Sequence, residues 1–406
     1  MKNLVIIGKV FPEPNSTAAG TRMLQLINIF LAQNYQITFL STASISENSF
    51  DLSSKNIQFQ NIVLNNNSFD DLIKKLNPKI VIFDRFTTEE QFGWRVSEQV
   101  PNALKILDTE DLHFLRNARE KAFKQNKNIE NSDLINDVFK RELASILRCD
   151  LSLIISEFEM NLLKTEFKIN ENILHYLPMF AECKNSEIPF SERKNFVSIG
   201  NFLHEPNWQT VLQLKKVWKN IKKQLPEAEI HIYGAYATEK VFQLHNKKEG
   251  FIVKGRAESV ETVFNNAKVL LAPIPFGAGI KGKLLESMQF GLPNVTSTVG
   301  AEAMHENFDW NGFITDNETE FVEKAILLYQ DENNWQKSKE NGYLIAKNLF
   351  KKEIFESDFN EKINWILEHL NEHRNANFLG QILQHHTLQS TKYLSKWIEE
   401  KNSKNQ

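Results

Sequence analysis

The sequence predicts an α/β fold made of two Rossmann-like, doubly wound parallel-sheet domains that face each other. Two series of short apolar runs, rich in Val, Ile and Phe, alternate with helical patterns along the chain. Runs that are apolar at successive positions suit strands covered by helices on both faces, as in parallel sheets. Because the strand–helix alternation occurs twice, we expect two such units. The length of 406 residues also favours more than one domain.

The strands of the first domain are expected at residues 4–7, 37–40, 80–83, 104–107, 151–155 and 173–177. Those of the second are expected at 196–199, 230–233, 251–253, 269–272, 294–297 and 313–315. A polar, Pro-containing stretch separates the two series and predicts the domain boundary. We therefore expect a first domain over 1–185 and a second over 186–350. The periodicity of 351–406 is helical only, which predicts helices that return to the first domain and a frayed tail from residue 399.

The composition excludes several classes of function. Lys and Arg number 48 against 51 Asp and Glu, so the formal net charge is -3, and no basic excess favours nucleic-acid binding. Two cysteines are too few for a disulfide framework and favour a reducing compartment. The apolar run near the N-terminus is too short for a signal peptide, and no run of 18 apolar residues predicts a membrane span. We expect a cytoplasmic protein.

The segment 271–302 carries the most informative pattern. A predicted strand ends in a Pro-containing turn, and Gly277 and Gly279 then bring bare backbone to the start of a helix. Unpaired N–H groups and the positive end of a helix dipole favour an anion such as a phosphate there. Lysines at 281 and 283 add positive charge in the first turn. The segment therefore predicts a phosphate-binding loop.

Lys283 and Glu286 are three residues apart and share one face of this helix. A diphosphate at the turn and ribose hydroxyls at the carboxylate would match a nucleoside diphosphate. The same spacing is equally compatible with a plain amphipathic helix that carries an i,i+3 ion pair. Spacing alone leaves both interpretations open.

Three further places lie at expected strand ends, where open α/β sheets bind ligands. Gly20 and Arg22 open a helix that Thr17 or Ser16 can cap, and they either face the cleft or form an ordinary helix start with an exposed arginine. His113 follows an acidic turn and is a candidate for orienting a hydroxyl, although a hydrogen-bonded structural histidine is the alternative. Asp84 and Arg85 have a similar placement with weaker support.

The run GAGIKGKLLESMQFGLPNVTSTVGAEAM, residues 277–304, resembles the donor-binding signature of retaining glycosyltransferases with the GT-B fold. Bacterial family 4, within group 1, is the group it resembles most. Segments 12–22, 108–116 and 198–208 resemble other parts of that family, so the resemblance spans roughly residues 1–345. It implies a GT-B fold.

The resemblance also implies roles for individual residues. Glu286 would hold the ribose hydroxyls of a sugar nucleotide, while Lys283 and the N–H groups of Gly279 and Ile280 would take the diphosphate. Arg256 would supply a cation that many members carry after the strand at 196–199. No metal or other cofactor is expected.

One position departs from the family pattern. The first glutamate of the family's E-x7-E motif would stand at 278, where this chain has Ala278. The identity of the donor sugar therefore stays open. The S-x-x-E pattern that ends at Glu159 resembles a helix start of the family and predicts capping of that helix.

The function implied is retaining transfer of a sugar from a nucleoside-diphosphate sugar to a hydroxyl acceptor, with Lys283 and His113 as the catalytic residues. The acceptor would be a carbohydrate or a lipid-linked glycan of the cell envelope. A sugar-nucleotide epimerase or hydrolase on the same fold and a non-catalytic partner subunit remain alternatives. The lysines at 215–223 predict either peripheral membrane contact or a solvated helix face.

Overall fold

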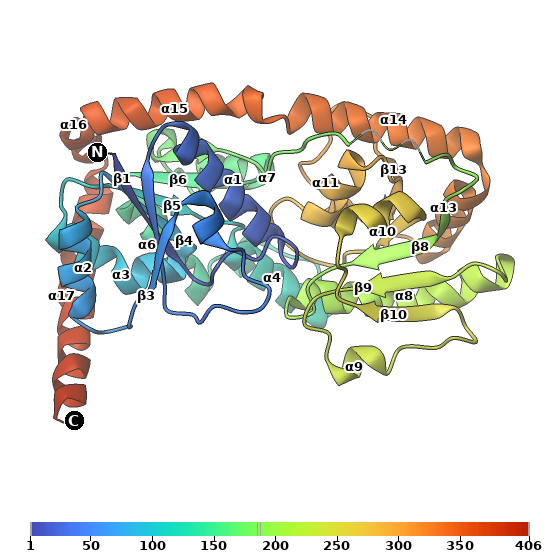
Figure 1. Cartoon of the computed structure of the whole chain (residues 1–406), viewed down its shortest axis with the longest axis horizontal. Helices are drawn as coiled ribbons and strands as arrows, with labels where there is room; N and C mark the ends of the chain where they lie inside the picture. The colour runs from blue at the N-terminus through green and yellow to red at the C-terminus, as the bar shows by residue number, and fades with distance from the viewer. Residues whose placement is uncertain (1, 185, 187, 405–406) are drawn as a thin grey trace.

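The computed structural model describes residues 2–184, 186 and 188–404 and shows two α/β domains side by side (Figure 1). Each domain contains one sheet whose paired strands are all parallel. The predicted fold class is therefore the observed one. The predicted boundary near residue 185 falls between the last strand of the first sheet and the first strand of the second.

The first domain has a seven-stranded sheet in the order β3-β2-β1-β4-β5-β6-β7. Its strands are β1 (Asn3–Gly8), β2 (Gln36–Ser41), β3 (Gln58–Asn61), β4 (Ile80–Asp84), β5 (Leu104–Asp108), β6 (Leu151–Ile154) and β7 (Leu174–Tyr176). Its helices are α1 (Ala18–Ala32), α2 (Ser68–Leu76), α3 (Phe86–Gln99), α4 (His113–Lys124), α5 (Asn131–Leu134), α6 (Asp137–Arg148) and α7 (Glu157–Thr165), with 3-10 turns at Leu52–Lys55 and Glu171–Ile173.

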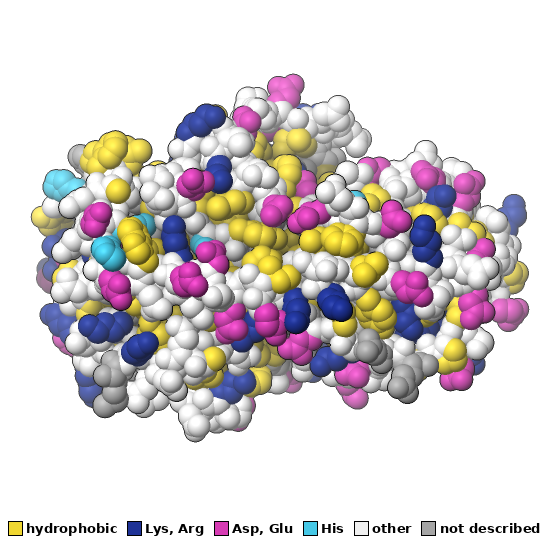
Figure 2. Space-filling view, turned by 90° about the horizontal axis from the view of Figure 1, so that it is seen from above, with side chains coloured by type: hydrophobic (Ala, Val, Ile, Leu, Met, Phe, Trp, Pro, Cys, Tyr) yellow, Lys and Arg dark blue, Asp and Glu magenta, His cyan; other side chains and the backbone are white. Residues whose placement is uncertain are grey.

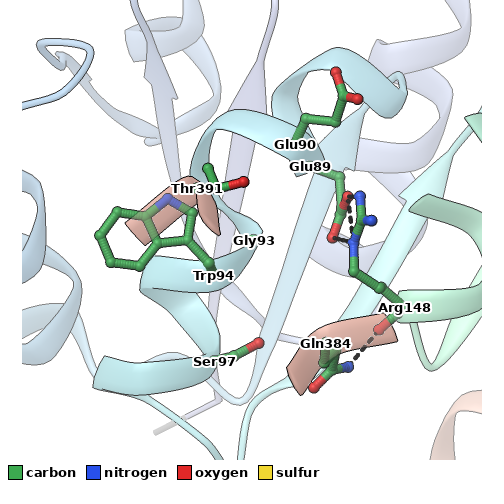
Figure 3. A pocket seen from close by; sticks show the side chains of 8 residues that line it. All are labelled: Glu89, Glu90, Gly93, Trp94, Ser97, Arg148, Gln384 and Thr391. Carbon is green, nitrogen blue, oxygen red and sulfur yellow. Dashed lines mark hydrogen bonds and ion pairs between the residues drawn. The ribbon is translucent and has the colours of Figure 1, made fainter. Parts of the chain in front are cut away.

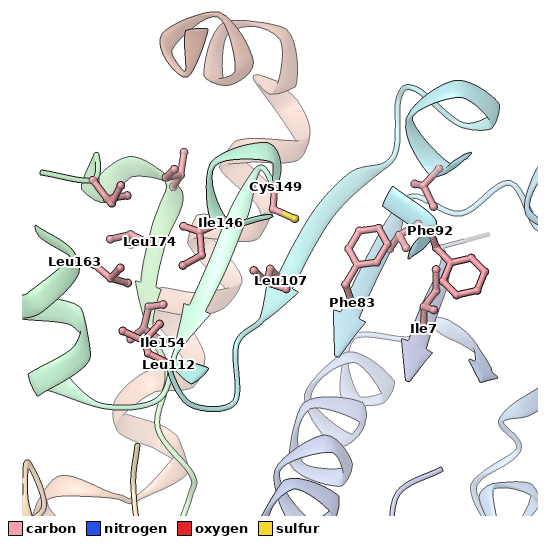
Figure 4. Close-up of a cluster of buried hydrophobic side chains, with 14 of the residues drawn as sticks. Ile7, Phe83, Phe92, Leu107, Leu112, Ile146, Cys149, Ile154, Leu163 and Leu174 are labelled. Atoms are coloured by element: carbon pink, nitrogen blue, oxygen red, sulfur yellow. The ribbon is translucent and has the colours of Figure 1, made fainter. Parts of the chain in front are cut away.

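Both faces of this sheet are buried, which explains the continuous apolar runs. Leu4 and Ile6 of β1 pack with α1 on one face, whereas Val5 and Ile7 belong to the cluster on the opposite face. That second cluster includes Phe83 of β4, Phe92 of α3, Leu107 of β5 and Ile146 of α6 (Figure 4). Side chains of neighbouring strand residues point to opposite faces, so a doubly covered strand must be apolar throughout.

The second domain has a six-stranded sheet in the order β10-β9-β8-β11-β12-β13. Its strands are β8 (Lys194–Ile199), β9 (Ile230–Tyr233), β10 (Phe251–Gly255), β11 (Ala267–Ala272), β12 (Asn294–Thr296) and β13 (Gly312–Ile314). Its helices are α8 (Glu205–Gln224), α9 (Glu239–Phe242), α10 (Val260–Asn266), α11 (Gly282–Gln289), α12 (Thr298–Ala301), α13 (Glu318–Gln330) and α14 (Glu332–Leu349). One core cluster includes residues of α8 and α13, and another includes residues of α11 and α14.

The chain then returns to the first domain through α15 (Lys352–Glu368), α16 (Leu370–Ala376) and α17 (Phe378–Ser403). Helices α14 and α15 run along one side of both domains, and α17 descends beside the first (Figure 1). Phe359, Ile363 and Ile366 of α15 are fully buried in the cluster that contains α1. Figure 2 views the molecule from that side and shows apolar side chains lying among charged ones. The predicted helical return is therefore observed.

Two details differ from the sequence predictions. Strand β3 was not expected, because its four residues are exposed and form no apolar run. The tail was expected to fray from Glu399, but α17 continues to Ser403. Glu399 forms an ion pair with Arg95 of α3, whose side chain is only 2% exposed. A long-range partner of this kind stabilises a helix that its own polar composition does not.

Replacing Phe359 with alanine should destabilise the protein by about 3–5 kcal/mol, because the ring is fully buried and packs edge-to-face on Phe30 of α1 at 5.8 Å. Ile354 lies on the same helix with 49% of its surface exposed, so Ile354→Ala is the matched control and should change stability by about 0.5 kcal/mol or less. Denaturant or thermal unfolding measures both. Equal effects of the two changes would contradict the packing of α15 on the first domain.

Candidate functional site

The candidate site lies between the carboxyl ends of the two sheets. In each sheet the strand order reverses between its first strand and a later one, at β1/β4 and at β8/β11, and ligands of open α/β sheets bind at such points. The two edges touch. The hydroxyl of Tyr236, after β9, donates to the carboxylate of Glu13, after β1, at 2.7 Å. A Cβ added to Gly282 at the start of α11 would lie 2.7 Å from the Cβ of Ala18 at the start of α1.

The loop between β11 and α11 contains the predicted phosphate-binding residues. Ala278 and Ile280 are buried, and Gly279 has a φ of 63°, a left-handed conformation that favours glycine. A Cβ on Gly279 would lie 2.9 Å from the Cβ of Asp111 in the first domain. Gly277 has more room, since its added Cβ would lie 3.4 Å from the nearest atom, in Lys281. The loop thus packs directly on the turn that precedes His113.

Helix α11 presents Lys283 and Glu286 on one partly exposed face. Burial lowers the pKa of Lys283 to about 8, an effect that the Glu286 carboxylate partly offsets. Burial likewise raises the pKa of Glu286 to about 7, against the influence of Lys283. Nζ of Lys283 donates to Oδ1 of Asn207 on α8 at 2.7 Å, so Asn207 is its hydrogen-bond partner. This arrangement weakens the interpretation as a plain i,i+3 ion pair and leaves a cation and a carboxyl group at the strand ends.

Arg119 of α4 also crosses to the second domain. Its guanidinium donates to both carboxylate oxygens of Glu302 at 2.8 and 2.7 Å, and to the carbonyl of Gly277 at 2.8 Å. The ammonium of Lys281 donates to the carbonyl of Gly279 at 2.6 Å. Burial lowers the pKa of Lys281 to about 8, which Glu302 partly offsets. The loop is therefore held from both domains.

His113 begins α4, and its ring is held in place. Nδ1 lies 3.0 Å from the carbonyl of Asp111 and 3.2 Å from Oε1 of Glu142, and the ring meets Phe86 edge-to-face. The buried Glu142 also accepts from the backbone N–H groups of His113 and Phe114, and so caps the helix from α6. The side chain of His113 stays 15% exposed. It fits the hydrogen-bonded alternative, and its catalytic role stays a prediction.

A cluster of acidic and basic groups surrounds the ends of β4 and β5. Arg85 and Glu110 have positive φ angles of 69° and 63°, a strained conformation for residues other than glycine. Burial, reinforced by Asp108, raises the pKa of Glu110 to about 8. Burial tends to raise the pKa of Asp111 as well, but its Arg116 partner keeps that pKa below the ordinary value. Strain and shifted pKa values concentrate at functional sites in many proteins.

The start of α1 has a largely structural role in this structure. Thr17 caps the helix as predicted, since its hydroxyl accepts from the N–H of Gly20 at 2.9 Å. A Cβ on Gly20 would lie 2.4 Å from the backbone of Glu13, so glycine permits close packing there. Arg22 is neither exposed nor open to the cleft, because it is 1% exposed and bonds to Asp108 and to the carbonyl of Leu177. Its predicted contact with the donor would require a rearrangement.

Two other predictions have different outcomes. Arg256 is exposed and follows β10, an edge strand that β9 and β8 separate from β11, so it lies apart from the loop.

Glu159 was predicted to cap α7, but it does not. Its Oε1 accepts from the N–H groups of Leu112 and Gly279, in the two domains, at 3.0 and 2.9 Å. The N–H of Gly279, predicted to bind diphosphate, is thus already paired.

A separate pocket lies between α3, α6 and α17, away from these strand ends (Figure 3). Glu89 and Arg148 form a buried ion pair on its wall, and Gln384 of α17 donates to the carbonyl of Arg148 at 2.7 Å. These contacts attach α17 to the first domain.

Elsewhere, Lys215 and Lys216 of α8 pair with Glu249 and Glu318, which favours the solvated-face interpretation of that helix.

Across the side chains that the structure describes, which leave out 185, 187, 386–388 and the two ends of the chain, no group of three or more His, Cys, Asp and Glu is placed to hold a metal ion. Within the same residues, no helix is both long and apolar enough to cross a membrane.

Changing Gly279 to alanine should destabilise the protein by about 1–3 kcal/mol, because alanine is strained at positive φ and its Cβ would press on Asp111. Gly277→Ala is the matched control in the same loop and should be tolerated, since its Cβ has room. Calorimetric unfolding of both variants checks this. A Gly277 variant as unstable as the Gly279 variant would contradict the loop geometry.

Comparisons with known proteins agree with this architecture. Residues 193–331, in the second domain, match the family model described as "Glycosyl transferases group 1". No curated protein sequence is a detectable relative of the chain.

Solved structures resemble the chain over most of its length. Sucrose-phosphate synthase from Thermosynechococcus elongatus has 12% identity and a TM-score of 0.67, covering 91% of this chain and 100% of its own. A glycosyltransferase from Rickettsia africae has 13% identity and a TM-score of 0.67, covering 90% and 99%. Anabaena HepE, in complex with UDP and glucose, has 12% identity and a TM-score of 0.63, covering 89% and 99%. Likeness at this level of identity establishes the fold.

Together with the motif at residues 277–304, these matches identify a glycosyltransferase: the second domain is that of the group 1 glycosyltransferases, and the chain as a whole has the GT-B fold.

Proposed function

We propose that this glycosyltransferase moves a sugar from a nucleoside-diphosphate sugar to a hydroxyl group of an acceptor, with retention at the anomeric carbon. The observation that carries the proposal is that Lys283 and Glu286 lie on the same face of the first turns of α11, at the carboxyl edge of the second sheet. An ammonium next to a helix start suits a diphosphate, and a carboxylate one turn deeper suits ribose hydroxyls.

The chemistry follows from the charges at the site. Negative charge grows on the diphosphate as the bond to the sugar breaks, and the Lys283 ammonium and the positive end of α11 would stabilise it. Burial disfavours the charged form of Lys283, and an adjacent anion favours it. Donor binding should therefore raise the pKa of Lys283 again. Because these groups supply the positive charge, we propose that transfer needs no metal. Contact between the two domains would exclude water from the reaction.

Similar structures support a uridine donor as the first to test. HepE was solved with UDP and glucose. The pneumococcal O-GlcNAc transferase GtfA, with 18% identity and a TM-score of 0.55, was solved with UDP and GlcNAc.

We further propose that the acceptor is a carbohydrate or lipid-linked glycan of the cell envelope, reached from the cytoplasm. Membership of family 4 and a catalytic role for His113 are parts of the same proposal.

Titration calorimetry with UDP-, GDP- and dTDP-sugars tests the proposal. One donor should bind, and Glu286→Ala should weaken its binding by about 10- to 100-fold, the value of hydrogen bonds to a charged group. Glu258→Ala, which removes an exposed carboxylate of the same domain, is the control and should bind as the wild type does. Binding of none of these donors would refute the enzyme proposal, and undiminished binding by the Glu286 variant would refute the role of that residue.

The affinity for the donor should depend on pH with two flanks. Binding needs the ammonium form of Lys283, so affinity should fall as pH rises through about 8. Binding also needs the carboxylate of Glu286, so affinity should fall as pH drops through about 7. Lys283→Arg should remove the upper flank, because a guanidinium stays charged there, and Glu286→Gln should remove the lower one. An unchanged profile in both variants would assign the flanks to other groups.

Reaction of the donor alone is the second candidate function, because the structure brings the buried acids Asp84, Asp108 and Glu110 to the cleft edge of the first domain. Incubation of the protein with the bound donor and no acceptor, followed by NMR of the sugar, separates the two candidates. A transferase should leave the donor nearly intact. Epimerised or hydrolysed donor at a rate comparable with transfer would favour the second candidate.

A further inference from the structure

Glu159 is a buried carboxyl group that contacts both domains. It lies in the first turns of α7 in the first domain and is 0% exposed. Its Oε1 accepts from the backbone N–H of Leu112 at 3.0 Å and from that of Gly279 at 2.9 Å. A single oxygen atom therefore joins the turn before α4 to the loop before α11.

Both of these backbone positions adjoin candidate site residues. Leu112 is the N-cap of α4, directly before His113, and Gly279 lies between β11 and the helix that carries Lys283. The added Cβ of Gly279 would also lie 3.2 Å from Cγ2 of Ile155, so the strand end before α7 packs against the same glycine. The contact between the domains is thus tightly packed around the Glu159 carboxyl group.

The state of this carboxyl group suits a neutral acceptor. Burial, reinforced by Asp111, raises the pKa of Glu159 to about 8, which favours the protonated form of the group. A protonated carboxyl keeps a carbonyl oxygen that accepts both N–H groups and avoids a buried charge, while Oε2, which would carry the proton, has no hydrogen-bond partner among the described residues. A glutamine side chain has nearly the same shape and the same accepting oxygen.

We propose that Glu159 is a positioning residue that aligns the Gly279 loop with the His113 turn where the two domains meet, and that the Gly279 N–H serves this contact instead of the donor diphosphate. The inference rests on the proposed function only for its effect on catalysis. The contact itself is present in the protein without any ligand. It accounts for a glutamate in the first turn of α7 whose carboxyl group accepts from two N–H groups outside that helix.

The first test needs no substrate. Hydrogen exchange of the full chain should show both the Leu112 and Gly279 amides protected in the wild type and in Glu159→Gln. In Glu159→Leu, which has similar bulk and no acceptor, both amides should exchange at least tenfold faster. Glu157→Leu is the matched control on the same helix, because Glu157 is exposed. Amides of β8 and β11 report on folding, and should Glu159→Leu unfold the protein, the shorter Glu159→Asp replaces it.

The second test separates rate from binding. Helix α11 is held by Leu284, Leu285 and Met288 in the core of the second domain, so donor binding should survive a displaced loop. Glu159→Leu should therefore lower kcat at least tenfold and change the donor KM less than threefold, whereas Glu159→Gln should restore kcat. Replacing a residue with only a structural role would not lower kcat while leaving the donor KM nearly unchanged, with kcat restored by glutamine.

Two results would overturn the inference: a Gly279 amide that stays protected in the leucine or aspartate variant, or a glutamine variant as impaired as the leucine variant. A donor titration in which the kcat of the leucine variant is unchanged would overturn the catalytic part. If the wild type binds no nucleotide sugar while the exchange results hold, the proposed function fails and the contact between the domains stands.

Discussion

The carboxyl edges of two parallel sheets meet face to face, and most features of the site depend on this constraint. Parallel strands place all their carboxyl ends on one edge, so each domain presents its loops and helix starts to the other. Small residues let the edges approach, as at Gly279 and Gly282, where any Cβ would collide with the first domain. Some charged groups near the strand ends find partners in the opposite domain, as Arg119 does at Glu302, whereas others, such as Arg22 and Asp108, pair within one domain.

Local charge would allow a chain with a formal net charge of -3 to bind the anionic donor that we propose. The positive field is local, because it arises from α11, Lys281 and Lys283 at the edge of one sheet. Burial lowers the pKa of both lysines to about 8 and raises that of Glu110 and Glu159 to about 8. The site therefore contains groups whose charge a ligand can change.

The C-terminal helices connect the two edges mechanically. Helix α14 is part of the core of the second domain, whereas α15 belongs to that of the first. The short segment between Leu349 and Lys352 is thus one of two connections between the domains, the other being the segment between β7 and β8. Further contacts, from Tyr236 to Glu13 and from Arg119 to Glu302, join the two domains directly.

Local patterns made most of the fold predictable. All twelve expected strands are present, because a strand that is buried on both faces has a run of apolar residues. Strand β3 was not predicted, because its residues are exposed. The motif around Lys283 and Glu286 could also be predicted, because its residues lie within one helix turn. The partners of Glu159, Arg119 and Arg22 were not readable, because each lies far away in sequence or in the other domain. The sequence by itself determined the two sheets and the charged face of α11. Only the tertiary structure decided which backbone and side-chain groups remain for a ligand. The reason is that hydrogen bonds between the domains depend on distances that no local pattern encodes.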